Sequence, residues 1–394
     1  MVIMLNTPFS PWPSFTNEET DAVASVLVSN RVNYWTGDLC RQFEVRFAEW
    51  TGTKHAVALM NGTVALDIAL KALNIGPGDE VITTSRTFIA SASCIVTAGA
   101  LPIFADVDPD SQNITAETIR AVLTPRTRAI ICVHLAGMPC DMDPIMALAR
   151  EYDLKVIEDC AQAHGARYRG RSVGSIGHVG AWSFCQDKIM TTGGEGGMVT
   201  TNDPQLWAAM WSYKDHGKDW ASVYERIHPP GPRLVHDHFG TNWRMIEMQA
   251  AIGLIQLKRM PDWTRQRAEW AARLSVACGA HEVFRVPAVP PHVNHAWYRF
   301  YAFIRPEHLG FGWSQDRMIQ EINDRGVPCF HGSASEVYLE AAFEDTGCRP
   351  EERLPVAKSL GETSIAFLVH PTLTDAEIER ACDVIGEVAD LAAA

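Results

Sequence analysis

Between about residues 55 and 211 the chain alternates short apolar runs with amphipathic segments, and this alternation constrains the fold more than any other feature. The apolar runs have the length of buried strands: His55–Leu59, Glu80–Thr84, Leu101–Ala105, Arg128–His134 and Leu154–Glu158. The segments between them have helical spacing: Val64–Leu73, Ser91–Ala98, Ala116–Leu123 and Pro144–Tyr152. Strands alternating with helices predict an α/β fold, with a mainly parallel sheet covered on both faces. Ligands of such sheets bind at the carboxyl ends of the strands, so candidate residues are sought after each run.

The remainder of the chain predicts a second, smaller domain. Glu247–Met260 has helical spacing, and Trp297–Ile304 alternates like a half-exposed strand after a proline-rich loop. Trp313–Asp324 and Asp375–Val388 are again spaced as helices. We therefore expect a large domain over residues 1–258, including an N-terminal segment, and a small α+β domain over residues 259–394.

Composition excludes several classes of protein. The 34 Lys and Arg residues against 47 Asp and Glu give a net charge of −13, which argues against sequence-independent nucleic-acid binding and gives no support to docking on an anionic membrane. No apolar run approaches the roughly 20 residues of a membrane span, and Met1–Pro8 lacks the features of a secretory signal. The ten cysteines occur singly, without a Cys-x-x-Cys pair, which favours reduced thiols over disulfides or a zinc site. We expect a cytoplasmic enzyme without a bound metal.

A lysine lies in an apolar segment that ends in glycines, Trp182–Gly197. An isolated lysine is most often a solvated residue on a turn. A partly desolvated amine, in contrast, can be neutral and form a Schiff base with a carbonyl compound. Lys188 is therefore a candidate nucleophile, and the glycines after it would allow close approach of a flat ligand.

Asp159 follows the predicted strand Leu154–Glu158. A single Asp in that place commonly caps a helix or lies in a solvated loop. Alternatively, its carboxylate would keep a pyridine nitrogen protonated, as pyridoxal 5′-phosphate (PLP) requires when it accepts electrons. The nearby His164 is interpreted as a packed or hydrogen-bonded residue before a catalytic one.

Asn61-Gly62-Thr63 stands between the first strand and the first helix of the alternating region. The free amides of a helix start, with a glycine and a hydroxyl, can bind a phosphate, and Ser183 would add a second hydroxyl. An Asn-Gly turn with a Thr cap explains this segment equally well. Phe88, after the next strand, would stack on an aromatic ring, although burial in the core is commoner for a single Phe.

Taken in order, these segments resemble the DegT/DnrJ/EryC1/StrS family of sugar aminotransferases, which are PLP enzymes of the aspartate aminotransferase-like fold (fold type I). The resemblance covers nearly the whole chain. Beyond the segments above, it rests on Gly37 with Phe43–Phe47, on Gly76–Ile82, Asp106–Asp108, His134–Gly137, Glu158–Gly165, Asn242–Met245 and Gln249–Ala251.

The resemblance implies a role for each matching position. Lys188 is similar to the lysine that binds the cofactor covalently, and Asp159 to the partner of the pyridinium nitrogen. Gln162 resembles the residue beside the phenolic oxygen of the ring, and Phe88 the stacking aromatic residue. The phosphate ligands would be Gly62, Thr63, Ser183 and, from the other subunit of a homodimer, Asn242.

The resemblance also implies a reaction, the transfer of an amino group from L-glutamate to C4 or C3 of a nucleotide-linked keto-deoxyhexose. Such a product would enter surface polysaccharide, including lipopolysaccharide, or a secondary metabolite. Family alternatives are an aminocyclitol aminotransferase and a sugar dehydratase, although the dehydratases have histidine where this chain has Lys188. A Rossmann oxidoreductase would need Gly-x-Gly-x-x-Gly after an early strand, which is absent, and a non-catalytic regulator has no reason to keep the full set of residues.

Overall fold

The computed structural model describes residues 7–393. Residues 1–6, which include most of the segment predicted not to be a secretory signal, lie outside the described part, as does residue 394. Among the described helices, none has both the length and the apolar character that a membrane crossing requires.

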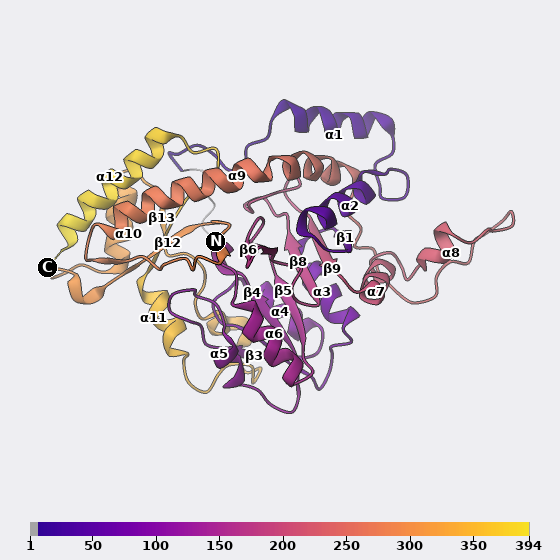
Figure 1. Ribbon diagram of the computed structural model, residues 1–394, viewed down its shortest axis with the longest axis horizontal. Coiled ribbons are helices and arrows are strands. Elements are labelled where there is room, and N and C mark those ends of the chain that lie inside the picture. The colour runs from indigo at the N-terminus through magenta and orange to yellow at the C-terminus, as the bar shows by residue number, and fades with distance from the viewer. Residues whose placement is uncertain (1–6, 394) are drawn as a thin grey trace.

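The central feature of residues 7–393 is a seven-stranded sheet with the strand order β1-β9-β8-β5-β4-β2-β3 (Figure 1). Neighbouring strands from β8 through β3 run parallel, while β9 runs antiparallel to both β1 and β8. The mainly parallel sheet predicted from the sequence is therefore confirmed. The strands are β1 His55–Leu59, β2 Glu80–Thr84, β3 Leu101–Ala105, β4 Thr127–Val133, β5 Lys155–Asp159, β8 Val179–Ser183 and β9 Gly197–Thr201.

The ends predicted from the sequence are correct to the residue for β1, β2 and β3. The predicted strand lies one residue too late for β4 and one residue too early for β5. Asp159, expected beyond its strand, is instead the last residue of β5. Strands β8 and β9 were not predicted, because β8 contains Gly180 and β9 starts at Gly197, and glycine weakens a strand pattern. Gly180 is required by close packing, since a Cβ there would lie 2.5 Å from the Cα of Gly174.

Helices cover both faces of the sheet because successive strand residues point to opposite sides. Val57, Ile131 and Ile157 pack in one core with α3, α4 and α7. Ile130 and Val156, one residue away along the same strands, share a core with α6 on the other face, where α2 and α9 form a further cluster. The helices up to this point are α1 Asn17–Ser29, α2 Leu39–Thr51, α3 Gly62–Ala72, α4 Ala90–Thr97, α5 Ala116–Arg120, α6 Met142–Glu151, α7 Pro204–Lys214 and α8 Trp220–Tyr224.

Helix α9, Glu247–Gly279, joins the two parts of the molecule and crosses most of Figure 1. The sequence predicted that this helix ends at Met260, before Pro261, but the helix runs on to Gly279 and has 33 residues in all. Proline removes one helical hydrogen bond, at a cost that packing of the rest of the helix can offset. The helix also buries Met260 in a core with α2 and Leu274 in the core of the C-terminal part. The domain division at residues 258/259 therefore falls within a continuous helix and stays a prediction.

The C-terminal part contains a four-stranded antiparallel sheet of order β10-β12-β14-β13, which packs against helices α9, α10 and α12. Its strands are β10 Phe284–Arg285, β12 Phe300–Ile304, β13 Cys329–Phe330 and β14 Ser364–Phe367. Its helices are α10 Gln315–Asp324, α11 Pro355–Thr363 and α12 Asp375–Ala392. The predicted helices at α10 and α12 are confirmed with shifted ends, and β14 was not predicted. A small third sheet joins β11 Val293–Asn294, β6 Arg167–Tyr168 and β7 Arg171–Ser172.

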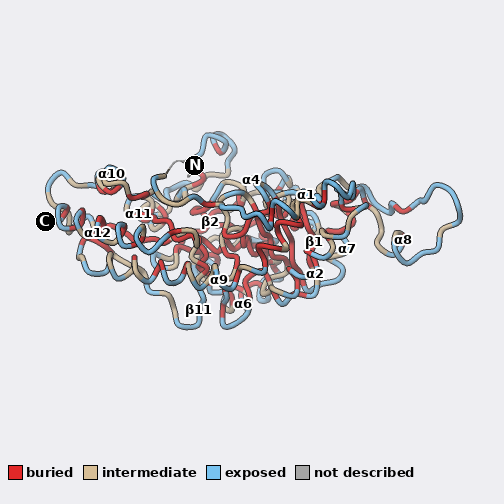
Figure 2. Tube along the Cα trace, turned by 90° about the horizontal axis from the view of Figure 1, so that it is seen from above, coloured by how far each residue is buried: buried red, intermediate tan, exposed pale blue. Residues whose placement is uncertain are grey.

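One segment projects from the body of the molecule. Residues 216–241, here called the arm, contain α8 and extend to the right in both Figure 1 and Figure 2. Buried residues fill the centre of the molecule in Figure 2, whereas the arm is mostly exposed. Its exposed apolar side chains include Ile227 (95% exposed), Leu234 (88%) and Phe239 (100%).

Candidate active site

The loops after four strands meet at the carboxyl edge of the large sheet. Gly62 follows β1, Phe88 follows β2, and Asp159 and Ser183 end β5 and β8. Ordered along the sheet, β8, β5 and β4 are direct neighbours, so residues distant in sequence lie side by side there. This is the edge at which ligands of parallel α/β sheets bind.

The predicted phosphate site is assembled from β1, α3 and β8. The Asn61 side chain caps α3 by accepting a hydrogen bond from the Val64 amide at 3.0 Å, so Asn61 and not Thr63 is the cap. The amides of Gly62 and Thr63 are the first of the helix and have no partner one turn earlier. A Cβ on Gly62 would lie 2.5 Å from the Ser183 Cβ, so only glycine permits this approach. Free helical amides beside a serine hydroxyl fit a phosphate group.

Asp159 is a buried carboxylate with few hydrogen bonds. One oxygen accepts from the Ser91 hydroxyl at 2.8 Å and the other from the Ala161 amide at 3.1 Å. Burial raises the pKa of Asp159 above its ordinary value, and Ser91, Ala161 and Lys188 oppose that rise in part. The structure therefore excludes the solvated loop carboxylate considered from the sequence. A buried carboxylate at this edge suits the cationic nitrogen of a ligand ring.

Phe88 is 59% exposed, which contradicts the expectation that a single Phe is more often buried in the core. It lies in the turn that begins α4, where its carbonyl accepts a hydrogen bond from the Ser91 amide at 3.2 Å. Because Ser91 also binds Asp159, one turn positions the exposed ring and the buried carboxylate together. An exposed aromatic ring at a ligand-binding edge suits stacking on a flat molecule.

Lys188 lies in the loop after β8, and its side chain is only 17% exposed. Its amine is 3.5 Å from an oxygen of Asp187 and 5.1 Å from the centre of the Tyr298 ring. Burial would lower the pKa of Lys188, but Tyr298, Asp187 and Cys185 raise it above its ordinary value. The desolvation expected from the sequence is present, while Tyr298 and Asp187 favour the charged form of the amine, and the role of Lys188 as a nucleophile stays a prediction.

Gln162 and His164 lie in the loop after β5. The Gln162 side-chain oxygen accepts from the Ala136 amide at 2.7 Å, which fixes its side chain at the end of the sheet. His164 is fully buried between the rings of Trp182 and Phe184, which confirms that it is a packed residue. Burial, assisted by the charge of Lys188, lowers the pKa of His164 to about 3, so this histidine stays neutral.

Asn242 has an exposed side chain between the arm and α9. The carbonyl of the next residue, Trp243, accepts from the Met60 amide at 3.0 Å, so this segment runs beside the end of β1 in its own chain. The predicted contact of Asn242 with a phosphate in a second subunit stays a prediction.

Three residues of the site were missed in the sequence. Ser91 is one helical turn from Phe88, and its position after a strand was an available signal. Asp187 directly precedes Lys188 but was passed over because it follows no predicted strand. Tyr298 gave no signal at all, because only the packing of the C-terminal part places it 110 residues later beside Lys188.

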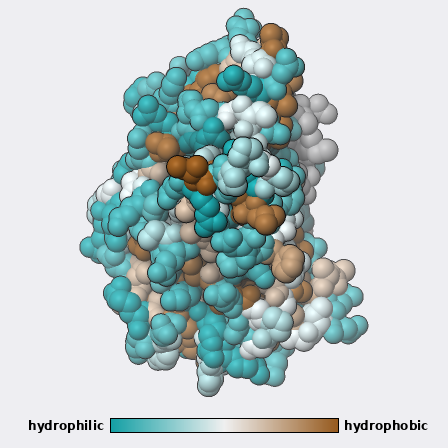
Figure 3. Space-filling view, turned by 90° about the vertical axis from the view of Figure 1, so that its right-hand side faces the viewer, coloured by the Kyte–Doolittle hydropathy of each residue, from teal (hydrophilic) through white to brown (hydrophobic). Residues whose placement is uncertain are grey.

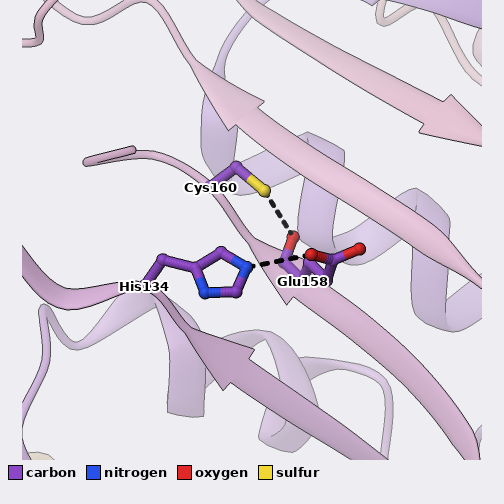
Figure 4. Close-up of side chains that lie close together, drawn as sticks. All are labelled: His134, Glu158 and Cys160. Carbon is purple, nitrogen blue, oxygen red and sulfur yellow. Dashed lines mark hydrogen bonds and ion pairs between the residues drawn. The ribbon is translucent and has the colours of Figure 1, made fainter. Parts of the chain in front are cut away.

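A second group of buried polar side chains lies behind the edge: His134, Glu158 and Cys160 (Figure 4). His134 Nδ1 accepts from the Cys140 amide at 3.0 Å, so Nε2 carries the proton and donates to Glu158 at 3.0 Å. The Glu158 carboxylate also accepts from the amides of Gly174, Ile176 and Gly177. Although these side chains are of metal-binding types, their hydrogen bonds already occupy the donor atoms, which fits a structural network.

Residues 13–386 match the sequence model of the DegT/DnrJ/EryC1/StrS aminotransferase family. The GDP-perosamine synthase of Caulobacter vibrioides is 37% identical to the chain over 389 residues, covering 95% of this chain and 96% of that protein. A solved aminotransferase from Psychrobacter cryohalolentis is 64% identical, with a TM-score of 0.96 and coverage of 97% of this chain and 98% of that one. A Streptococcus pneumoniae protein described as a sugar aminotransferase, solved in a PLP form, is 25% identical, with a TM-score of 0.86 and coverage of 98% and 99%.

Proposed function

The chain belongs to the DegT/DnrJ/EryC1/StrS aminotransferase family, whose members use PLP, and from this premise we propose that it aminates a nucleotide-linked keto-deoxyhexose at C4 or C3 with L-glutamate as the amino donor. The observation that carries the proposal is the joint position of Lys188, Asp159 and the Gly62–Ser183 contact at one sheet edge. An amine, a carboxylate and an anion site at one edge support binding of PLP, which carries an aldehyde, a ring nitrogen and a phosphate. The GDP-perosamine synthase relative supports a nucleotide sugar as acceptor.

When bound, PLP supplies an electron sink that stabilises negative charge on the carbon next to the transferred nitrogen. Gly62 and Thr63 amides and the Ser183 hydroxyl bind its phosphate. Asp159 holds the proton on the ring nitrogen, because a buried carboxylate is stabilised by an adjacent cation. Phe88 would orient the ring by stacking, and Gln162 would contact it on the side of its phenolic oxygen.

Lys188 has two tasks in this proposal. Its Nζ would hold the cofactor covalently and, when freed by the amino donor, would act as an acid and base. In the first half-reaction it would take the proton from the α-carbon of glutamate, and in the second it would give a proton to the acceptor carbon. A sugar dehydratase is disfavoured, because the amine needed for these transfers is present at position 188.

The functional unit that we propose is a homodimer with shared active sites. Its support is the arm, whose exposed Ile227, Leu234 and Phe239 give an apolar surface that monomers rarely keep. Figure 3 views the molecule from the end that carries α8, where hydrophobic side chains lie among hydrophilic ones. In the dimer Asn242 would reach the phosphate site of the partner. The proposed setting is cytoplasmic synthesis of surface polysaccharide, such as lipopolysaccharide, or of a secondary metabolite.

The test is a panel of nucleotide-linked ketosugars, with GDP, UDP and dTDP carriers, incubated with purified protein and glutamate. We expect a visible absorbance band that borohydride removes, formation of 2-oxoglutarate, and one aminated sugar whose new amine is located by NMR. A protein without the band contradicts the cofactor assignment. A protein that has the band but removes a hydroxyl without adding nitrogen is a dehydratase, and a carbocyclic ketone as the only acceptor would identify an aminocyclitol enzyme.

A further inference from the structure

Asp187 connects the lysine of the large sheet to the C-terminal part of the molecule. One carboxylate oxygen lies 3.5 Å from the Lys188 amine, and the other accepts a hydrogen bond of 2.5 Å from the Tyr298 hydroxyl. The Tyr298 ring itself lies below the amine, at 5.1 Å. The amine is therefore held between a carboxylate and an aromatic ring that are 111 residues apart in the sequence.

Both partners of this contact are fixed by further bonds. The backbone amide of Tyr298 donates to the Ala136 carbonyl at 2.8 Å, and the Arg299 guanidinium lies 4.8 Å from the Tyr298 ring. On the lysine side, the Trp12 indole N–H donates to the carbonyl of Lys188 at 2.8 Å. Because the backbones of Tyr298 and Lys188 are both anchored, the Tyr298 hydroxyl fixes the orientation of the Asp187 carboxylate. That carboxylate in turn restricts where the Lys188 amine points.

We propose that Asp187, oriented by Tyr298, is a positioning residue that directs the Nζ of Lys188 and stabilises positive charge on that nitrogen. This inference rests on the proposed function, since Lys188 is the amine assigned to proton transfer. The electrostatic attraction between the Asp187 carboxylate and Lys188 is strong at this spacing, because two opposite charges about 3 to 4 Å apart in a buried site interact far more strongly than in water.

The charges around Lys188 agree with this assignment. Asp187 and Cys185 face it from its own loop, Tyr298 and Arg299 from the segment before β12, and Asp159 and His164 from β5 and its loop. Burial would raise the pKa of Asp187, but Lys188, Tyr298 and Arg299 lower it below its ordinary value. Asp187 therefore stays ionised, and a proton that leaves Nζ passes to the substrate carbon and not to this carboxylate.

The experiment compares Asp187→Asn, Tyr298→Phe and Asp187→Glu with the wild type. The control is Glu195→Gln, which removes a charge from an exposed position of the same loop. The first readout is the pH midpoint of the visible band of the holoenzyme. The second is the pH dependence of Lys188 modification by trinitrobenzenesulfonate in the full chain freed of PLP, located by peptide mass spectrometry.

We expect Asp187→Asn to lower both midpoints by about one to two pH units, since loss of an opposite charge at this range shifts a pKa by that amount. Tyr298→Phe should lower them less, Asp187→Glu should restore most of the shift, and Glu195→Gln should leave them unchanged. Wild-type midpoints in Asp187→Asn, or in Tyr298→Phe if Asp187→Asn does not fold, would overturn the proposal. Absence of the visible band in the wild type would instead overturn the proposed function, while lysine modification would still test Asp187.

Discussion

Strand β5 ends in two consecutive carboxylates, Glu158 and Asp159, which point to opposite faces of the sheet and have different surroundings. Glu158 accepts hydrogen bonds from three amides and from His134. Asp159 accepts one from Ser91 and one from Ala161. Burial would raise the pKa of both residues; at Glu158 the bonds from His134 and the amides outweigh it and lower the pKa, whereas at Asp159 burial prevails and the pKa is raised.

The difference separates a carboxylate that stabilises the fold from one that is available to a ligand. Four donors satisfy Glu158, so its charge is stabilised by the protein alone. Burying the charged form of Asp159 has a free-energy cost that its two hydrogen bonds do not offset, and a cationic ligand would reduce that cost. Burial by itself does not distinguish the two residues, because both are almost inaccessible, but the number of hydrogen-bond donors does.

The largest effect is expected at Lys188, whose charge acts on Asp159. Lys188→Ala should abolish the borohydride-sensitive band and reduce turnover by at least about 10⁴-fold, since it removes both the covalent attachment and the proton carrier. Absorbance and single-turnover kinetics measure this. Lys54→Ala, at an exposed position, is the control and should behave as wild type. A Lys188→Ala protein with normal transamination would refute the assignment.

The next effect tests the ligand side of the comparison. Asp159→Asn should still bind the cofactor, but turnover should fall by about 10² to 10³-fold because an amide cannot keep the ring nitrogen protonated. Its stability should be equal or higher at neutral pH. An acid with a raised folded pKa loses stability as pH rises above its unfolded value, and Asn removes that loss. Thermal unfolding at neutral and acid pH measures it; unchanged turnover would contradict the role of Asp159.

The third effect tests the structural side. Glu158→Gln should lower the free energy of unfolding by about 3 kcal/mol, because one amide oxygen cannot satisfy the donors that the carboxylate binds. Since the folded pKa of Glu158 is lowered, its contribution is present above the unfolded value and is lost as pH falls through the folded value. The difference from wild type should therefore shrink in acid. Urea unfolding measures it, with the exposed Glu117→Gln as control.

The smallest effect sharpens the comparison by removing one donor from Asp159. Ser91→Ala deletes the hydrogen bond that lowers the pKa of Asp159, so that pKa should rise further. The acid limb of the activity profile should move to higher pH, and turnover at neutral pH should fall by about tenfold, equivalent to about 1.4 kcal/mol. Ser93→Ala, on the same helix, is the control. An unchanged profile would show that the Ser91 bond is not important for Asp159.

Much of the fold could be predicted because the pattern in the sequence is local. A buried parallel strand favours a continuous apolar run, and β1 and β3 have one, so their ends were correct to the residue. Strand β8, with Gly180, carried too weak a pattern, and α9 passed through Pro261 because two cores hold it. Local signals fail where packing between distant segments outweighs the preference of single residues.

For the candidate site, the alternation of strands and helices in the sequence is sufficient to place Gly62, Phe88 and Asp159 at one edge, whereas Ser183 joins them at the end of β8, which was not predicted. That follows from parallel strand direction, which the alternation of strand and helix enforces. Only the tertiary structure decided the charge states. Glu158 and Asp159 differ by one residue in sequence, but their pKa values move in opposite directions because their donors come from separate loops. Likewise, Tyr298, from the segment before β12, holds Asp187 near the Lys188 amine, and both favour the charged form of that amine.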